Sequence, residues 1–254
     1  MAKVAYSLDS NYNSLVDAWR SAAKKDGLVI AELLVDFGVR FSYNSGRIEN
    51  TLISYHDTRD VFENGHAVAY SGDVRTLFEI QNLKTSYELM LKKLEKKNPI
   101  TEKLVLEFHE VLTQGTYDER RWSLGERPGQ YKKQDYVVGA HDAGLPAAKV
   151  GAARRSLCTE LKAATPENVL TVAAYFHAQF ENIHPFSDGN GRCGRALTNY
   201  LLLLNEHPPI IVFDEDKLAY YGALDAFDTE ADLDPMLEFL KAETIKTWSK
   251  SLSV

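Results

Sequence analysis

The chain has 254 residues, of which 44% are hydrophobic and 26% charged, as is usual for a globular protein with a substantial core. The formal net charge of -7 argues against a nucleic-acid partner, because a nucleic-acid-binding surface carries an excess of basic residues. The sequence has no apolar run of membrane-spanning length and no secretory signal pattern, and its two cysteines are Cys158 and Cys193. We therefore expect a cytoplasmic protein with no membrane partner.

The spacing of apolar residues predicts a nearly all-helical chain. Residues 1–72 are expected to form an N-terminal helical region, and residues 73–254 a second domain that ends in further helices. Within this second domain, helix-start signals stand at Asp73, Thr101, Thr165, Asp214 and Asp234. Thr165 and Asp234 are each followed by a proline, which favours the first turn of a helix.

One segment departs from the helical pattern. Residues 127–139 combine turn residues with alternating β-favouring residues, which predicts a short β-hairpin. A surface hairpin without any role in function is the alternative interpretation of this segment.

The most informative stretch runs from His184 to Arg195 and reads His-Pro-Phe-Ser-Asp-Gly-Asn-Gly-Arg-Cys-Gly-Arg. The apolar segment that follows it predicts a helix. Backbone N–H groups of a glycine-rich turn at a helix N-terminus bind phosphate, so Gly189, Asn190 and Gly191 are expected to contact a transferred phosphate. The guanidinium groups of Arg192 and Arg195, three residues apart, lie on one face of this helix and can bind further phosphate oxygens.

Two titratable residues of this stretch suggest its chemistry. His184 has the pKa range of a general base near neutral pH, and a carboxylate such as Asp188 can hold Mg²⁺ together with substrate phosphates. Asp188 could instead cap the following helix, which is the commonest role of an aspartate at this position. His177 lies about two helical turns before His184, which leaves open a metal cluster of His177, His184 and Asp188.

The stretch resembles the signature of the Fic family (filamentation induced by cAMP), His-x-Phe-x-Asp/Glu-Gly-Asn-Gly-Arg-x-x-Arg, and fills every specified position. The resemblance extends over residues 75–230. It implies an all-α Fic fold with a short β-hairpin flap and an N-terminal helical extension. It also implies a nucleotidyltransferase, a protein adenylyltransferase (AMPylator), that uses Mg-ATP to transfer AMP to a Ser, Thr or Tyr hydroxyl of a target protein.

The same resemblance assigns further residues around the nucleotide. In family members that use ATP the second arginine holds the γ-phosphate, so Arg195 implies ATP as the substrate. Tyrosines in the place of Tyr220 and Tyr221 approach the nucleotide in relatives, although packing in the core explains these two residues equally well.

Residues 127–139 correspond to the family's flap over the active site, where the backbone of the target docks as an added strand. The residues expected to form this flap are Lys132, Lys133, Gln134, Asp135, Tyr136 and Val137. Lys132 departs from the arginine that is usual in the family.

A shorter pattern lies upstream, from Ser45 to Glu49 and Asn50, and resembles the family's inhibitory motif, Ser/Thr-x-x-x-Glu-Gly/Asn. Taken alone, Ser45 and Glu49 are an ordinary pair one helical turn apart. Together with the phosphate-binding stretch, the resemblance implies autoinhibition, in which Glu49 pairs with Arg195 and takes the place of the γ-phosphate.

Two other functions remain open at this point. The first is a Fic-type hydrolase that removes AMP from a modified protein, with Glu49 aligning the attacking water. The second is a catalytically silent nucleotide-binding regulatory module that Glu49 holds closed. Self-modification and a homo-oligomer also remain open, and the sequence does not name the target.

Overall fold

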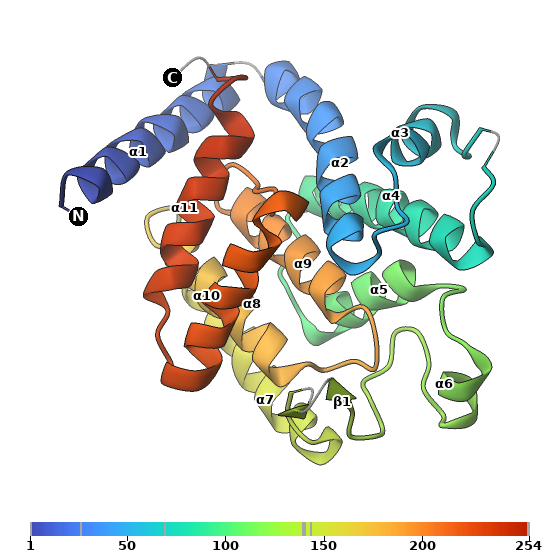
Figure 1. Ribbon diagram of the computed structural model, residues 1–254. Coiled ribbons are helices and arrows are strands. Elements are labelled where there is room, and N and C mark those ends of the chain that lie inside the picture. Colours follow the sequence, from blue (N-terminus) through green and yellow to red (C-terminus); the bar gives the residue numbers. More distant parts are fainter. Residues whose placement is uncertain (1, 26, 69, 139–140, 143, 253–254) are drawn as a thin grey trace.

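Figure 1 presents the computed structural model of the chain, which describes residues 2–25, 27–68, 70–138, 141–142 and 144–252. The fold is all-α. Its helices are α1 (Ala2–Lys25), α2 (Gly27–Glu49), α3 (Tyr55–Asn64), α4 (Val74–Glu95), α5 (Glu102–Thr113), α6 (Glu119–Ser123), α7 (Ala147–Glu160), α8 (Val169–Ile183), α9 (Asn190–Leu204), α10 (Lys217–Glu230) and α11 (Asp234–Trp248), with short 3₁₀ turns η1 (Leu161–Ala163) and η2 (Asp214–Asp216). None of the described helices has both the length and the apolar content that a bilayer span requires.

The central element is α9, which packs against α8, α5, α4 and α2 (Figure 1). Its side chains at Leu197, Tyr200 and Leu202 are fully buried. A helix that is apolar around most of its circumference belongs in a core, and here four other helices cover it. The first turns of α9, which carry Arg192 and Arg195, are therefore held in place from several sides.

The N-terminal helices share the core of the remaining chain. Trp19 of α1 packs against Trp248 of α11 with ring centroids 4.9 Å apart, and Phe37 of α2 stacks on the same Trp248 at 5.6 Å. Farther along, α2 packs on both α4 and α9. This packing brings the end of α2, with Ser45 and Glu49, beside the start of α9, whereas the boundary between residues 72 and 73 stays a prediction.

Several predicted helix starts are confirmed by their caps. The Asp73 side chain accepts a hydrogen bond from the Thr76 N–H at the start of α4, and the Thr101 hydroxyl accepts one from the Leu104 N–H at the start of α5. The last helix, α11, begins at Asp234 as expected. Asp214 begins the short turn η2 rather than a helix, and α10 follows from Lys217.

The predicted helix start at Thr165 is wrong by about one turn. Helix α8 begins at Val169, because the Thr165 N–H donates to the Asn168 side-chain oxygen at 2.8 Å and the Asn168 amide donates back to the Ala163 carbonyl at 3.1 Å. Asparagine side chains that bond nearby backbone groups in this way compete with helix formation. Residues 165–168 consequently form a turn.

The segment of the predicted hairpin contains two strands of two residues each. Strand β1 (Val137–Val138) pairs antiparallel with β2 (His141–Asp142), with Val137 opposite Asp142 and Val138 opposite His141. Gly139, the last residue of the predicted segment, lies outside the described residues. Upstream of β1, the Lys132 N–H donates to the Pro185 carbonyl at 2.9 Å, which ties this segment to the stretch after α8.

Candidate active site

The loop between α8 and α9 begins and ends with residues in the left-handed backbone region. His184 ends α8 with φ 47°, and Gly189 precedes α9 with φ 80°. A Cβ at position 189 would lie 2.6 Å from the Thr113 Cγ2, so both the backbone angle and the close neighbour require glycine there. The two turns reverse the chain within a few residues and direct the loop to the N-terminus of α9.

The side chain of Asn190 shapes this loop from within. Its Oδ1 accepts the Phe186 N–H and its Nδ2 donates to the Phe186 carbonyl, both at 2.9 Å. Because both polar ends of the side chain are engaged, Asn190 fixes the loop, and its backbone N–H is the group that remains for a ligand.

Phe186 anchors the loop in an aromatic stack. Its ring lies 3.6 Å from the His109 ring and 5.3 Å from the Tyr131 ring, with interplanar angles of 4° and 10°. The His109 Nδ1 accepts the Gly129 N–H at 2.9 Å, so the Nε2 carries the proton and donates to the Asp188 carbonyl at 3.0 Å. Burial lowers the pKa of His109 to about 4, which keeps this ring neutral. The sequence analysis missed His109.

His184 is also a neutral histidine. Burial and the nearby charge of Lys132 lower its pKa to about 4, although a hydrogen bond to the Glu181 backbone carbonyl favours the protonated form. That hydrogen bond engages one ring N–H, so in the neutral ring the other nitrogen is an acceptor. Lys132 itself is buried, with 4% of its surface exposed. His184 therefore has the protonation state of a base at neutral pH.

Three arginines surround the carboxylate of Asp188. Its Oδ2 lies 3.0 Å from the Arg75 Nη2 and 3.5 Å from the Arg121 Nη2, and its Oδ1 lies 3.3 Å from the Arg192 Nη2. Burial opposes ionisation, but these three charges outweigh it and hold the pKa of Asp188 below its usual range. Arg75 and Arg121 come from α4 and α6, and the sequence analysis missed them.

The metal cluster of His177, His184 and Asp188 does not form. The His177 Nε2 lies 2.7 Å from the Tyr220 hydroxyl, and its Nδ1 lies 3.2 Å from the Thr198 hydroxyl. Within residues 2–25, 27–68, 70–138, 141–142 and 144–252, no group of three or more His, Cys, Asp or Glu side chains is arranged to hold a metal ion. His177 is thus a hydrogen-bonded core residue.

The predicted inhibitory residues meet Arg195. The Arg195 Nη2 donates to the Glu49 Oε1 and to the Ser45 carbonyl, both at 2.8 Å, and its Nε donates to the Ser45 hydroxyl at 3.0 Å. Arg195 has 3% of its surface exposed. Burial opposes the charge of Glu49, but Arg195 and its hydrogen bond hold the pKa of that carboxyl below its usual range. Glu49 is therefore an ionised partner of Arg195.

Asn50 fastens the end of α2 to α4. Its Nδ2 donates to the Thr76 hydroxyl at 2.9 Å and to the Glu79 Oε2 at 2.7 Å, while its Oδ1 accepts the Leu52 N–H at 2.9 Å. The other carboxylate oxygen of Glu79 lies 3.6 Å from the Arg192 Nη1. The end of α2 is thus linked through Glu79 to Arg192.

The two predicted tyrosines differ in their surroundings. Tyr220 is buried, and its hydroxyl lies 2.7 Å from the His177 Nε2 and 3.5 Å from the Arg195 Nη1. Tyr221 has 41% of its surface exposed, and the Lys217 ammonium lies 5.5 Å from the centre of its ring. Tyr220 therefore packs in the core behind Arg195, whereas Tyr221 has an accessible face.

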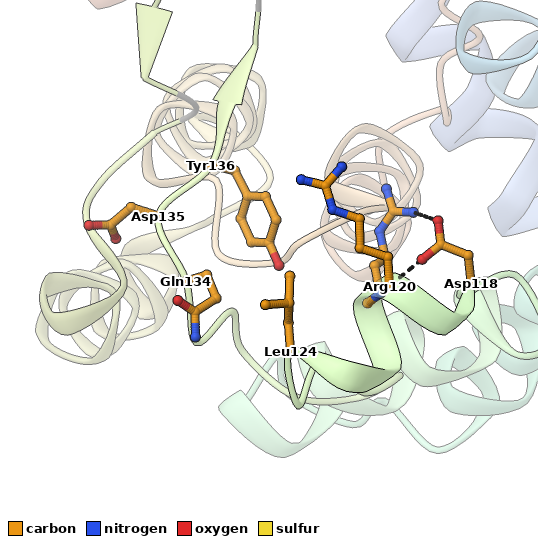
Figure 2. Close-up of a pocket in the computed structure, with 7 residues that line it drawn as sticks. Asp118, Arg120, Leu124, Gln134, Asp135 and Tyr136 are labelled. Carbon is orange, nitrogen blue, oxygen red and sulfur yellow. Dashed lines mark hydrogen bonds and ion pairs between the residues drawn. The ribbon is translucent and has the colours of Figure 1, made fainter.

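A cavity of about 550 Å³ opens between α6 and the segment before β1. Figure 2 shows Tyr136 and Leu124 facing one another across it, with Asp118 bonded to an arginine at one side. Of the predicted flap residues, Gln134, Asp135 and Tyr136 line this cavity.

Buried Glu126 holds the predicted flap in place. Its Oε1 accepts the Tyr136 hydroxyl and the Lys133 N–H, both at 2.9 Å. Arg121, which lines the cavity, also contacts Asp188, so the cavity adjoins the loop between α8 and α9. The predicted flap therefore lies next to the candidate active site, and its role stays a prediction.

Comparison with known proteins gives one consistent family. The model described as "Fic/DOC family" matches residues 99–202. "Protein adenylyltransferase Fic" of Drosophila persimilis is 27% identical over 256 residues, which cover 97% of this chain and 47% of that protein. The protein of the same name from Aedes aegypti is 29% identical over 215 residues, which cover 82% of this chain and 40% of that protein. The chain thus spans about half the length of the curated relatives it matches, or less.

Solved structures agree in fold. A Fic domain containing signaling protein from Bacteroides thetaiotaomicron has a TM-score of 0.80 at 22% identity, with 96% of both chains covered. A Fic family protein from Desulfovibrio desulfuricans has a TM-score of 0.77 at 26% identity and covers 98% of this chain and 74% of its own. Fic-1 from C. elegans has a TM-score of 0.79 at 19% identity, with 98% and 73% covered.

Proposed function

We propose that the chain, whose residues 99–202 match the model described as "Fic/DOC family", is a protein adenylyltransferase that transfers AMP from Mg-ATP to a hydroxyl side chain of a target protein. The observation that carries this proposal is His184, a neutral histidine at the start of a loop that leads into the N-terminus of α9. A base beside an anion-binding loop is the arrangement that phosphoryl-type transfer needs. The names of the curated relatives support the same activity.

In the proposed reaction His184 activates the target. Its free ring nitrogen takes the proton of the target hydroxyl, whose oxygen forms a bond to the α-phosphorus of ATP while the bond to pyrophosphate breaks. The hydrogen bond to the Glu181 carbonyl orients the ring and fixes which nitrogen is the acceptor. The charge of Lys132 opposes protonation of the ring, so the base stays available well below neutral pH.

The phosphates of ATP would lie against the start of α9. The backbone N–H groups of Gly189, Asn190 and Gly191 are proposed to stabilise the charge that builds on the α-phosphate. The Arg192 Nε is buried and has no hydrogen-bond partner within the described part of the chain, which fits a missing oxygen ligand such as a phosphate. Arg195 is proposed to hold the γ-phosphate once Glu49 has left it.

Asp188 is the residue proposed to hold Mg²⁺. Mg²⁺ is commonly bound by one or two carboxylates together with substrate phosphates, so a single carboxylate beside the phosphate loop fits this ion. The three arginines around Asp188 keep it ionised, as a metal ligand must be. Bound there, the ion would neutralise charge on the phosphates and the leaving pyrophosphate.

The contact between Glu49 and Arg195 supports autoinhibition. A carboxylate on Arg195 occupies the guanidinium that the γ-phosphate needs, so ATP would bind in an orientation that does not favour attack on its α-phosphate. Asn50 holds the end of α2 against α4 and thereby keeps Glu49 in place. The protein is therefore expected to have low activity at rest.

A second activity is favoured by the ionised state of Glu49. An ionised carboxylate beside the phosphate loop can accept a proton from water, which would allow hydrolysis of an AMP group from a modified protein. A target would approach in either case along the flap, with its backbone beside residues 132–137 and its side chain toward His184.

The test is transfer of label from ATP. We expect the Glu49→Gly variant, incubated with ATP labelled in its α-phosphate and Mg²⁺ in a cell lysate, to label a protein other than itself, and Glu49→Gly/His184→Ala to label none. If the active variant binds ATP but transfers no AMP to any protein, the chain is a regulatory nucleotide-binding module. Release of AMP from a modified protein by the unsubstituted chain would instead support the hydrolase.

A further inference from the structure

Glu181 is a partly buried acidic residue that the proposed reaction does not use through its side chain. It lies on α8, three residues before His184, and its Oε1 is buried with no hydrogen-bond partner among the groups of the described residues. A Cβ at position 194 would lie 2.6 Å from this oxygen, so Gly194 leaves the space in which the carboxyl lies. An unpaired buried carboxylate is unfavourable, and burial raises the pKa of Glu181 to about 8.

The neighbours of Glu181 come from four helices. The titratable groups that face it are Glu49 from α2, His177 from α8, Cys193 and Arg195 from α9, and Tyr220, Tyr221 and Asp228 from α10. Of these, Arg195 favours the ionised form of Glu181, whereas Glu49 and Asp228 favour the neutral form. Glu181 and Glu49 therefore both act electrostatically on one buried guanidinium, that of Arg195.

Only one of these two carboxylates can balance the charge of Arg195 at a time. Glu49 forms the ion pair, with 2.8 Å between its Oε1 and the Arg195 Nη2. Once Glu49 is ionised, a second negative charge on Glu181 would have no compensating partner in the same buried space, so Glu181 takes the proton. The negative charge of Glu49 then balances the positive charge of Arg195, and Glu181 is neutral.

We propose that Glu181 is a positioning residue that pairs with Arg195 when Glu49 withdraws and releases it, by taking up a proton, when the γ-phosphate of ATP arrives. The inference rests on the proposed function, because it needs a γ-phosphate at Arg195. Glu49, Glu181 and the γ-phosphate would then neutralise the same guanidinium in turn. Arg195 would remain in its binding position between inhibition and nucleotide binding, since an anion holds it in each state.

The sign of the proton exchange follows from these charges. Loss of Glu49 removes a negative neighbour and leaves Arg195 unpaired, so both changes lower the pKa of Glu181 and it ionises. A γ-phosphate at Arg195 restores a negative neighbour and raises that pKa again. ATP binding to a form without Glu49 should therefore take up a proton near neutral pH, whereas ADP, which has no γ-phosphate, should not.

The experiment measures proton uptake by calorimetry. Mg-ATP and Mg-ADP are titrated into Glu49→Gly/His184→Ala, in which turnover is blocked, at one pH near 7.5 in two buffers of different ionisation enthalpy. We expect uptake of roughly half a proton or more per ATP, and markedly less per ADP. Adding Glu181→Gln should abolish the difference between the two nucleotides, because glutamine keeps the shape of the protonated side chain and cannot titrate.

A second readout is the pH dependence of ATP affinity. In Glu49→Gly/His184→Ala the affinity should fall as the pH rises above the pKa of Glu181, by at most about tenfold per pH unit, and Glu181→Gln should remove this fall. An infrared difference spectrum of the same variant with isotope-labelled glutamate should gain the carbonyl band of a protonated carboxyl when ATP is added, which needs no substitution of Glu181.

The possible failures are distinguishable. Equal proton uptake with ATP and ADP, or uptake that survives Glu181→Gln, overturns the role of Glu181 and leaves the transferase proposal in place. Absence of ATP binding to Glu49→Gly/His184→Ala overturns the proposed function, and this inference with it.

Discussion

The Arg195 Nη2 lies 2.8 Å from the Glu49 Oε1, although Glu49 ends α2 and Arg195 lies in the second turn of α9. The same guanidinium also bonds the hydroxyl and the carbonyl of Ser45. A buried arginine that is bound at two of its three nitrogens by one helix is not available to a phosphate. The contact therefore relates the N-terminal helices directly to the proposed nucleotide site.

Replacing Glu49 should release the protein from inhibition. We expect Glu49→Gly to raise AMP transfer, including self-modification, by about tenfold or more, and by much more than it raises ATP affinity, because the change corrects the orientation of ATP. Rates and dissociation constants with labelled ATP and Mg²⁺ would measure both effects. Glu230→Gly, at the exposed end of α10, is the control for a glycine at a helix end. Equal rates in the unsubstituted chain and in Glu49→Gly would refute autoinhibition.

Arg195→Ala should behave differently from Glu49→Gly. It removes the partner of Glu49 and the proposed γ-phosphate ligand together, so we expect weak ATP binding and no gain in transfer. A gain as large as that of Glu49→Gly would contradict a role for Arg195 in binding ATP.

Loss of His184 should greatly slow AMP transfer and leave ATP binding nearly unchanged. We expect His184→Ala in the Glu49→Gly background to lower transfer by about 10² to 10⁴-fold with little change in ATP affinity, because the base acts on the incoming hydroxyl. Since the pKa of His184 is about 4, its protonation should not reduce the rate between pH 8 and 6. His56→Ala, at an exposed histidine, is the control. Near-normal turnover without His184 would exclude it as the base.

Asp188 should govern the response to Mg²⁺. We expect Asp188→Ala to lower transfer by about 10²-fold or more and to abolish its dependence on Mg²⁺ concentration, because no other carboxylate is proposed to hold the ion. Asp188→Asn, which keeps the shape and removes the charge, should behave in the same way. A variant that stays active and metal-dependent would leave Asp188 only as a partner of Arg75, Arg121 and Arg192.

Asn50 should influence the contact between Glu49 and Arg195 without taking part in it, because it bonds Thr76 and Glu79 instead. We expect Asn50→Ala to lower the free energy of unfolding by about 1–3 kcal/mol, because Thr76 and Glu79 lose a buried partner, and to raise transfer to a level between the unsubstituted chain and Glu49→Gly. Asn205→Ala, which removes one hydrogen bond to the Leu201 carbonyl, should destabilise without activating. Equal activation by both variants would mean that a general loss of stability, rather than release of the end of α2 from α4, relieves inhibition.

Stability should be highest near pH 6.5. Four histidines have pKa values of about 3 to 4 in the folded chain against 6.5 when unfolded, namely His109, His177, His184 and His207. Below pH 6.5 the unfolded chain binds more protons at these residues, so stability falls toward pH 4. Glu181 and Glu243, with pKa values raised to about 8 and about 7, reverse the sign above pH 6.5, because there the folded chain holds more protons.

Urea unfolding at pH 5, 6.5 and 8 would measure this profile, with a slope of about 1.4 kcal/mol per pH unit for each proton of difference. Glu243→Gln is the matched variant. It removes a group that holds an extra proton in the folded chain between about pH 4.5 and 7, so it should steepen the rise in stability below pH 6.5 and reduce the fall between pH 6.5 and 7. Stability that rises steadily from pH 6.5 to 8 would contradict the raised pKa values.

The residues of the predicted phosphate loop could be recognised together because they are consecutive in the chain. His184, Asp188 and Arg195 reach the same loop and helix start through local turns, so a linear motif describes them. The capping residues Asp73 and Thr101 were predictable for the same reason, since a cap acts within three residues. The inhibitory contact was predicted from a resemblance, and only the packing of α2 on α9 brings Glu49 to Arg195.

The parts that the sequence analysis missed depend on residues from different helices. Arg75 and Arg121 meet at Asp188 only because α4 and α6 bring them to the same carboxylate oxygen. The neutral state of His109 follows from its burial, and the Gly129 N–H that the fold brings to its ring fixes the tautomer. The late start of α8 follows from a side-chain hydrogen bond of Asn168 that competes with a helix-favouring proline.

The two roles proposed for Arg195 limit how the proposed inhibition can be lost by mutation. A substitution at Arg195 frees Glu49 but also removes the residue proposed to bind ATP, so it does not raise AMP transfer. Substitutions at the end of α2, by contrast, remove the contact between Glu49 and Arg195 and leave the proposed contact between Arg195 and the γ-phosphate intact. A genetic selection for hyperactive variants would therefore recover substitutions around residues 45–50 and leave the arginine unchanged, and the spectrum of recovered alleles would by itself map the boundary between regulation and catalysis.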